Sequence, residues 1–266
     1  MRIHYLSDLH LEFGNQDITL PDGELLILAG DITVARSLDP TKTDAQNRKT
    51  RQKAHAFFNQ TRERFNTVIY IAGNHEHYGF DIEASADVIH EHITDDRLLF
   101  LENQVFETNG IAFLCCTLWA DMDRRNPLAL RNVGRAMNDF YVIERGGRRF
   151  TPNMAAELHD ASMAWLRREL AARKNQRVVV VTHHAPSYQC MSAKFANNSI
   201  NHGFASDLDD LILAHPNIDT WVFGHTHVRV SLTIGSTRVL SNAAGYPGDE
   251  RHGFDPNTSF EIPNGT

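Results

Sequence analysis

The sequence predicts an α/β protein in which sheets and helices are stacked in layers, and three observations support this. Short apolar segments rich in Val, Ile and Leu recur along the chain. Longer segments with apolar residues at helical spacing lie between them. Strands that alternate with helices are typical of α/β layers. Polar side chains follow the apolar segments directly, and ligands of open α/β sheets bind at the carboxyl ends of strands.

Five short apolar segments are predicted to be strands that are covered on both faces. They contain few polar residues on either face, which is typical of strands buried between two layers. These strands are residues 3–7, 24–29, 67–72, 178–182 and 218–223. Residues 97–118 and 228–241 are interpreted as further strand pairs, antiparallel at least in part.

Two helices are predicted from the 3.6-residue spacing of their apolar residues. The first contains Ile82, Ala86, Ile89 and Ile93. The second follows the start signal Thr151-Pro152 and contains Met154, Leu158, Ala161 and Trp165. No repeat or linker divides the chain, so we expect a single domain over residues 1–266. The tail from residue 247 is interpreted as loops that cover the surface.

Composition excludes several classes of protein. Acidic residues outnumber basic residues, 33 to 26, and a net charge of −7 disfavours nucleic acid or an anionic membrane as a partner. The three cysteines are an odd number, which indicates a reduced, cytoplasmic protein with buried thiols. The amino-terminal stretch resembles neither a signal peptide nor a membrane span.

The ends of the five predicted strands carry polar side chains that could meet at one edge of a sheet. Each strand is followed by a carboxylate, an amide or an imidazole. The short motifs are Asp8-Leu9-His10, Gly30-Asp31, Gly73-Asn74-His75-Glu76, Thr182-His183-His184 and Gly224-His225-Thr226-His227. One such motif is weak evidence, whereas five at the same edge predict a common site.

Imidazole and carboxylate groups without a thiolate are ligands for Mn, Fe, Zn or Ni. The seven candidates are too many for one four-coordinate ion and suit two ions that share a ligand. They are Asp8, His10, Asp31, Asn74, His183, His225 and His227. Side chains two apart face the same way along an extended chain, which explains the D-x-H and H-x-H spacings. We expect Gly30, Gly73 and Gly224 to let the backbone turn sharply beside the site.

Together, and in this order, these motifs resemble those of the calcineurin-like metallophosphoesterases. The resemblance extends from Asp8 to His227 and implies a four-layer αββα sandwich with two central mixed β-sheets. It also implies a dinuclear site with Asp31 as the bridging ligand. One metal would be held by Asp8, His10 and His227, and the other by Asn74, His183 and His225. His75 would assist the leaving group, as a general acid or as an electrostatic partner.

The resemblance implies an enzyme that hydrolyses P–O bonds with a metal-bridging hydroxide. Small bacterial phosphoesterases of this kind often cleave phosphodiesters, so we favour a diester substrate. A phosphomonoesterase remains the alternative, acting on a protein or a small molecule. A nuclease for short oligonucleotides and a non-catalytic metal-binding scaffold are weaker alternatives. The donor set favours Mn or Fe and allows Zn. The sequence does not predict the oligomeric state.

Substrate-binding residues are harder to predict, because they lie in segments 36–60, 120–150 and 186–206. Between residues 124 and 149 there are seven arginines and no lysine, including Arg131 and Arg135. This segment could form a cap that guides an anionic substrate, since Arg binds phosphate in a bidentate manner. A solvated arginine face is the competing interpretation. His202 could contact substrate or solvent, and Asn74 and His75 are further candidates for substrate binding.

Overall fold

Two sheets form the centre of the computed structural model, which describes residues 1–14, 18–192, 198–248 and 253–263. The first sheet has the strand order β13-β1-β2-β3-β4. Strands β1 to β4 run parallel, and β13 pairs antiparallel with β1. The bounds are Arg2–Leu6 (β1), Gly23–Ala29 (β2), Phe65–Ile71 (β3), Leu98–Phe100 (β4) and Ser259–Glu261 (β13).

The second sheet has the strand order β11-β12-β10-β9-β6-β5. Its four inner strands run parallel, and the two edge strands β5 and β11 are antiparallel to their neighbours. The bounds are Gln104–Thr108 (β5), Ile111–Cys116 (β6), Arg177–Thr182 (β9), Ile218–Phe223 (β10), Val230–Ile234 (β11) and Thr237–Ser241 (β12). Both sheets are therefore mixed, as the resemblance implied.

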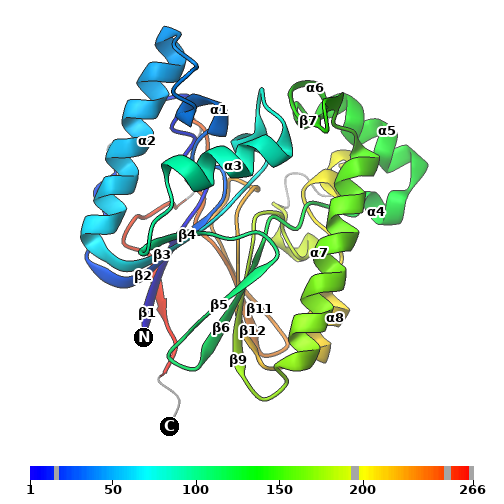
Figure 1. Ribbon diagram of the computed structural model, residues 1–266. Helices are drawn as coiled ribbons and strands as arrows, with labels where there is room; N and C mark the ends of the chain where they lie inside the picture. Colours follow the sequence, from blue (N-terminus) through cyan, green and yellow to red (C-terminus); the bar gives the residue numbers. More distant parts are fainter. Residues whose placement is uncertain (15–17, 193–197, 249–252, 264–266) are drawn as a thin grey trace.

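Helices cover the outer face of each sheet, which gives four layers (Figure 1). Helices α1 (Ala35–Leu38), α2 (Ala45–Arg64) and α3 (Ile82–His92) pack on the first sheet. Helices α7 (Pro152–Ala172) and α8 (Asp209–Ala214) pack on the second. The expected αββα sandwich is confirmed.

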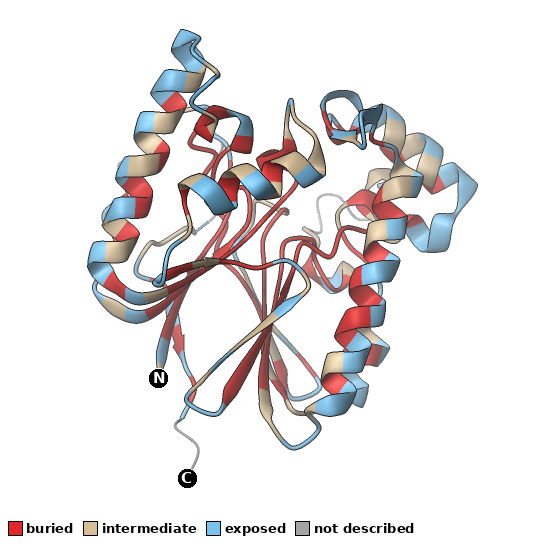
Figure 2. Cartoon of the chain, viewed as in Figure 1, coloured by how far each residue is buried: buried red, intermediate tan, exposed pale blue. Residues whose placement is uncertain are grey.

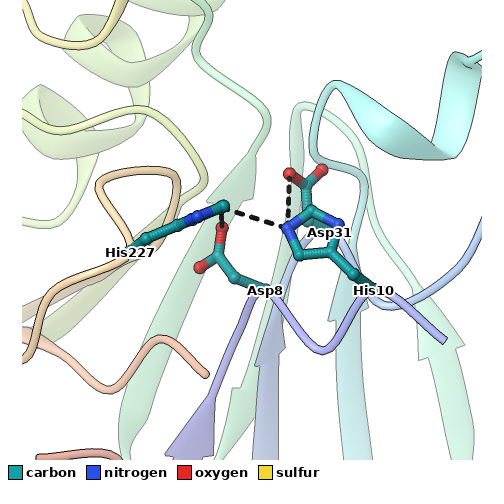
Figure 3. A group of neighbouring side chains, drawn as sticks. All are labelled: Asp8, His10, Asp31 and His227. Atoms are coloured by element: carbon teal, nitrogen blue, oxygen red, sulfur yellow. Dashed lines mark hydrogen bonds and ion pairs between the residues drawn. The ribbon is translucent and has the colours of Figure 1, made fainter. Parts of the chain in front are cut away.

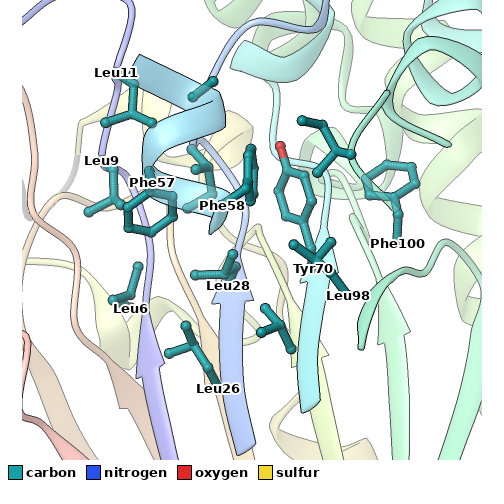
Figure 4. Close-up of a cluster of buried hydrophobic side chains, with 14 of the residues drawn as sticks. Leu6, Leu9, Leu11, Leu26, Leu28, Phe57, Phe58, Tyr70, Leu98 and Phe100 are labelled. Atoms are coloured by element: carbon teal, nitrogen blue, oxygen red, sulfur yellow. The ribbon is translucent and has the colours of Figure 1, made fainter. Parts of the chain in front are cut away.

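Alternating side chains explain why the central strands are apolar on both faces. In β2, Leu26 and Leu28 point toward the helices, where they join Phe58 of α2 (Figure 4). Leu25 and Ile27 point the other way and pack between the two sheets. Successive side chains of a strand face opposite ways, so each strand contributes to two apolar layers. Figure 2 shows these strands as the most continuously buried part of the chain.

Helix α2 begins in the segment 36–60, which the sequence pattern did not resolve, and ends at Arg64. Its amino terminus is capped by Asp44, which accepts a hydrogen bond from the Asn47 amide at 3.0 Å. Only a narrow stripe of its 20 residues is buried: Thr50, Ala54, Phe57, Phe58 and Thr61. Two of these are threonines and the rest of the helix is strongly polar, so the apolar period was too weak to indicate a helix.

The segment 120–150 folds over one end of the second sheet as a small cap. It comprises α4 (Met122–Arg125), α5 (Pro127–Ala136), α6 (Asp139–Val142) and the hairpin of β7 (Glu144–Arg145) and β8 (Arg148–Arg149). A separate cluster that includes Trp119, Phe140 and Phe150 anchors it to the amino-terminal part of α7. All four residues of α4 have φ between 55° and 60°, so this turn is left-handed, a conformation that costs about 1–2 kcal/mol per residue.

The carboxy-terminal tail differs from its prediction as a loop. Strand β13 pairs with β1 at the edge of the first sheet, and Phe260 and Ile262 are buried between the sheets. Strand β13 spans only three residues, which is too short for a recognisable pattern. Among the described residues no helix is long and apolar enough to cross a membrane. Cys115, Cys116 and Cys190 are free and buried.

Candidate metal centre

The carboxyl ends of the parallel strands in both sheets meet at one place. Asp8, Asp31 and Asn74 follow β1, β2 and β3 of the first sheet, while His183 and His225 follow β9 and β10 of the second. Backbone hydrogen bonds hold these ends together: the Asp8 amide donates to Gly30 at 3.0 Å, and the Gly224 amide donates to His183 at 3.0 Å.

One group of ligand atoms is formed by Asp8, His10, Asp31 and His227, all within 4.8 Å of one another (Figure 3). His227 Nε2 lies 3.4 Å from Asp8 Oδ1 and 3.1 Å from His10 Nε2. His10 Nε2 is 3.8 Å from Asp31 Oδ2. Backbone and side-chain donors fix Asp8, which accepts hydrogen bonds from the His225 amide and the Ser7 hydroxyl.

A second group is formed by Asp31, His183 and His225, also within 4.8 Å. His183 Nε2 lies 3.4 Å from Asp31 Oδ2 and 3.1 Å from Asn74 Oδ1. The other ring nitrogen of His183 lies 2.8 Å from the Ala29 carbonyl. That contact makes Nδ1 the protonated nitrogen and leaves Nε2 as a ligand atom. Asp31 thus belongs to both groups.

These side chains fit divalent ions because the lone pairs of their ligand atoms point toward shared positions between them. His225 Nε2 is buried and has no hydrogen-bond partner among the described residues. Burial lowers the pKa of His183, but the charges of Asp31 and Asp8 outweigh it and raise this pKa to about 10. The buried carboxylates therefore demand positive charge, which divalent ions would supply in place of protons. The donors are oxygen and nitrogen atoms, as Mn, Fe and Zn require.

Five of the seven predicted ligands lie in the left-handed region of backbone conformation. The φ angles range from 47° at His10 to 67° at His225, and Asp8, Asp31 and His227 lie between them. Non-glycine residues rarely adopt such angles, and clusters of them mark functional sites. The strain turns these side chains inward from the ends of their strands.

The three glycines beside the site serve different purposes. Gly30 has φ +87° and provides the sharp turn that was expected. At Gly73 and Gly224 space matters instead: a Cβ on Gly73 would lie 2.2 Å from Asp31 Oδ1, and one on Gly224 would lie 2.8 Å from Asp8 Oδ2. These positions require the absence of a side chain.

His75 lies beside the first group and both of its ring nitrogens are engaged. Nδ1 is 2.9 Å from Glu12 Oε1, and Nε2 is 3.0 Å from the Tyr246 hydroxyl. Burial lowers the pKa of His75, but the charges of Asp31 and Glu12 raise it overall, to about 9. The His75 amide donates to Asp31 Oδ1 at 2.8 Å, which couples the position of His75 to that of the shared carboxylate.

A cavity of about 1110 Å³ opens from the metal centre. Its described lining includes Asp31, Asn74, His75, His225 and His227 at one end. Beyond them the wall is mixed. Its apolar part includes Met137, Met191, Ile200, Phe204, Val230 and Leu232, and polar residues such as Gln189, Asn201 and Ser231 lie among them. The cap contributes residues 136–139 and the segment after β9 contributes residues 189–192.

The cavity does not include every residue that we considered for substrate binding. Arg229 is the one Lys or Arg side chain among the described lining residues, whereas Arg131 and Arg135 of α5 are absent from it. His202 is also absent, and its Nδ1 lies 2.8 Å from the Tyr188 hydroxyl. Segment 36–60 provides no lining residue, because α2 covers the outer face of the first sheet.

Comparison with known families identifies this arrangement. The model of the calcineurin-like phosphoesterase family matches residues 1–229. The chain belongs to this family. Its members hydrolyse phosphoric esters with divalent metals, and the clustered histidines and aspartates of the structure agree with such a site.

Two relatives show how far the similarity extends. The uncharacterized protein L509 of Acanthamoeba polyphaga mimivirus is 24% identical over 98% of this chain and 97% of its own length. Among solved structures, phosphopantetheinyl hydrolase PptH from Mycobacterium tuberculosis is similar, with a TM-score of 0.64 and 18% identity. The match covers 92% of this chain and 89% of PptH. At this identity it shows that the two share a fold.

Glu76 supports the candidate centre through buried hydrogen bonds and was not among the predicted site residues. It is fully buried and accepts hydrogen bonds from the amides of Asp31, Ile32 and Gly73 at 2.9, 2.7 and 2.6 Å. The Tyr70 hydroxyl donates a fourth at 2.8 Å. Glu76 therefore ties together the ends of β2 and β3, from which Asp31 and Asn74 project. Its place in G-N-H-E was the available signal.

Three further residues hold predicted site residues in place. Glu12 contacts both His75 and His10, Asp139 accepts a hydrogen bond from Asn74 Nδ2 at 2.8 Å, and Tyr246 contacts His75. Asp139 lies in the cap and Tyr246 in the loop after β12. Asp139 and Tyr246 are distant in sequence from the five motifs, which hid them, whereas Glu12 lies only two residues after His10.

His77 and His184 pack beside the centre outside both ligand groups. Trp119 lies next to each of them, stacked on His77 at 6.0 Å and tilted against His184 at 5.2 Å. Burial lowers the pKa of His77 to about 4 and that of His184 to about 3. Both are therefore neutral near pH 7 and support the site by packing.

Proposed function

We propose that this protein is a dinuclear phosphodiesterase that cleaves P–O bonds. The observation that carries the proposal is the position of Asp31, which belongs to two separate groups of ligand atoms. A carboxylate has two oxygens and can bridge two ions. Asp8, His10 and His227 would hold one ion, and Asn74, His183 and His225 would hold the other.

Bound divalent ions supply positive charge that activates water and neutralises phosphoryl oxygens. The chain orients the remaining groups. Glu12 and Asp139 hold His75 and Asn74 respectively, so the polar side chains at the mouth of the centre keep one orientation. Preorganised groups of this kind favour the charge distribution of the transition state without having to rearrange.

The preference for a diester rests on the cavity. A phosphomonoester carries up to two negative charges, whereas a diester carries one and has a second organic group to bind. The described lining offers one arginine, Arg229, and a wall whose apolar part includes Met191, Val230 and Leu232. Such a wall can bury an organic substituent, and it offers little compensation for a second charge.

A phosphomonoesterase is the alternative, because Arg229 and the ions could bind a dianion. The net charge of −7 argues against long nucleic acids as substrates. Mn or Fe suits the donor set, and Zn is compatible with it. We retain the cytoplasm as the expected location because all three cysteines are free thiols.

The test is hydrolysis of bis-p-nitrophenyl phosphate by metal-stripped protein that has been reloaded with Mn²⁺. p-Nitrophenyl phosphate is assayed in parallel, and bound metal is counted by mass spectrometry. We expect two ions per chain, turnover of the diester, and loss of turnover and of bound metal in Asp31→Asn. Asp87→Asn on the exposed face of α3 is the matched control. Preference for the monoester would exclude the diesterase, and one ion per chain would exclude the dinuclear centre.

A further inference from the structure

His75 and Tyr246 both line the cavity, and the Tyr246 hydroxyl occupies Nε2 of His75. The family resemblance led us to expect that His75 itself meets the leaving group. We propose instead that the hydroxyl of Tyr246 is the group that contacts the leaving oxygen, with His75 held behind it. This inference rests on the proposed phosphoesterase function and adds a catalytic residue that none of the five motifs contains.

The surroundings of His75 leave no ring atom free for a substrate. Glu12 occupies Nδ1 at 2.9 Å and Tyr246 occupies Nε2 at 3.0 Å. Tyr78 stacks on one face with a centroid distance of 3.9 Å, and His10 approaches at 4.3 Å. His75 is 2% exposed. A substrate oxygen can therefore reach Nε2 only if Tyr246 moves away.

Tyr246, in contrast, is accessible from the cavity. It is 38% exposed and lines the cavity beside the predicted ligands. Its ring lies 4.5 Å from the rings of both His10 and His227, and Phe13 packs against it at 5.5 Å. These contacts hold the ring over the first ligand group. The hydroxyl therefore lies at Nε2 of His75 and beside the first ligand group, on the wall of the cavity.

A phenol hydroxyl suits this position because it both donates and accepts hydrogen bonds. Its hydrogen can rotate about the C–O bond toward a ligand oxygen while a lone pair stays directed at His75. A hydrogen bond to an oxygen that gains negative charge is strengthened as the P–O bond breaks. The benefit is largest for leaving groups that carry negative charge poorly.

Leaving groups of different stability distinguish this role from a packing role. The substrates are methyl p-nitrophenyl phosphate and methyl phenyl phosphate, assayed with Mn²⁺-loaded wild type, Tyr246→Phe and His75→Gln. We expect Tyr246→Phe to lower kcat/KM for the phenyl ester about 10- to 100-fold, the range for a lost hydrogen bond to a charged group. The p-nitrophenyl ester should be affected clearly less. Tyr141→Phe, which removes an exposed hydroxyl from α6, is the control and should change neither.

An equal decrease for both esters would overturn the proposal, since a structural defect does not depend on the leaving group. Unchanged or faster hydrolysis by Tyr246→Phe would also overturn it. If His75→Gln then lost the phenyl ester selectively, His75 would be the group that reaches the leaving oxygen.

Binding of orthovanadate gives a second readout that does not require turnover. Its five-coordinate form places an oxygen at the leaving position and imitates the transition state. Calorimetry with the Mn²⁺-loaded proteins should show weaker binding by Tyr246→Phe, by about 10-fold or more. Equal affinity would overturn the role of Tyr246. If the wild type binds metal and vanadate but hydrolyses no ester, the phosphodiesterase proposal fails, and the vanadate comparison still decides the contact of Tyr246.

Discussion

Replacing Glu76 by Gln should destabilise the protein strongly although the two side chains have the same shape. Each carboxylate oxygen accepts from at least one backbone amide: Oε1 from Ile32, and Oε2 from Asp31 and Gly73. A glutamine has one oxygen and one NH₂ group. Either orientation therefore leaves at least one buried amide facing another donor.

The magnitude follows from this geometry. A buried donor without a partner costs about 1–3 kcal/mol. Burial and the charge of Asp31 raise the pKa of Glu76 to about 7, so above that pH the remaining hydrogen bonds also lose a charged acceptor. We expect the free energy of unfolding to fall by about 2–5 kcal/mol in total, a large share of the 5–15 kcal/mol that is usual for a domain. The amide that loses its acceptor is that of Asp31 or of its neighbour Ile32, so the position of the shared carboxylate should shift and affinity for Mn²⁺ should fall as well.

Urea unfolding of metal-free protein, followed by far-UV circular dichroism, measures the change. Glu91→Gln on the exposed face of α3 is the matched control and should lie within about 0.5 kcal/mol of wild type. Metal titration of both variants completes the assay. If Glu76→Gln were as stable as Glu91→Gln, the reasoning about the buried carboxylate would be refuted.

Three further predictions concern other parts of the molecule. In the folded protein the pKa of His77 lies near 4, below its value of 6.5 in the unfolded chain. Between these two pH values the unfolded chain binds a proton at His77 that the folded protein does not bind. The contribution of His77 to the stability of metal-free protein should be lost as the pH falls from about 6.5 to 4, so His77→Gln should lose less stability than wild type over this range in urea titrations. The same pH dependence in both proteins would contradict this. Replacing both Arg131 and Arg135 by Ala should leave KM for the diester within about 2-fold of wild type, because neither residue lines the cavity. Arg229→Ala should raise KM about 3- to 10-fold. The opposite ranking of the two variants would place the anion-guiding role in the cap. Gly73→Ala should displace the shared carboxylate and reduce bound Mn²⁺ in equilibrium dialysis, and full metal occupancy would show that the loop adapts.

The sequence by itself determined the central layers and which side chains gather at the candidate centre. Strands β1, β2, β3, β9 and β10 were predictable because a strand covered on both faces needs apolar residues at consecutive positions. The seven candidate ligands were recognisable because each follows such a strand within a few residues. The order of residues along the chain was sufficient to predict both the strands and the candidate ligands.

Tertiary structure decided what surrounds those ligands. Glu12, Asp139 and Tyr246 belong to loops and a cap that no periodic pattern marks, and their roles arise from contacts with residues distant in sequence, as between Tyr246 and His75. The cluster of arginines suggested a substrate-binding role, but Arg131 and Arg135 do not line the cavity. Charge composition does not reveal which way a side chain points. Helix α2 and strand β13 escaped prediction because a narrow buried stripe and a three-residue strand gain their stability from packing against the first sheet.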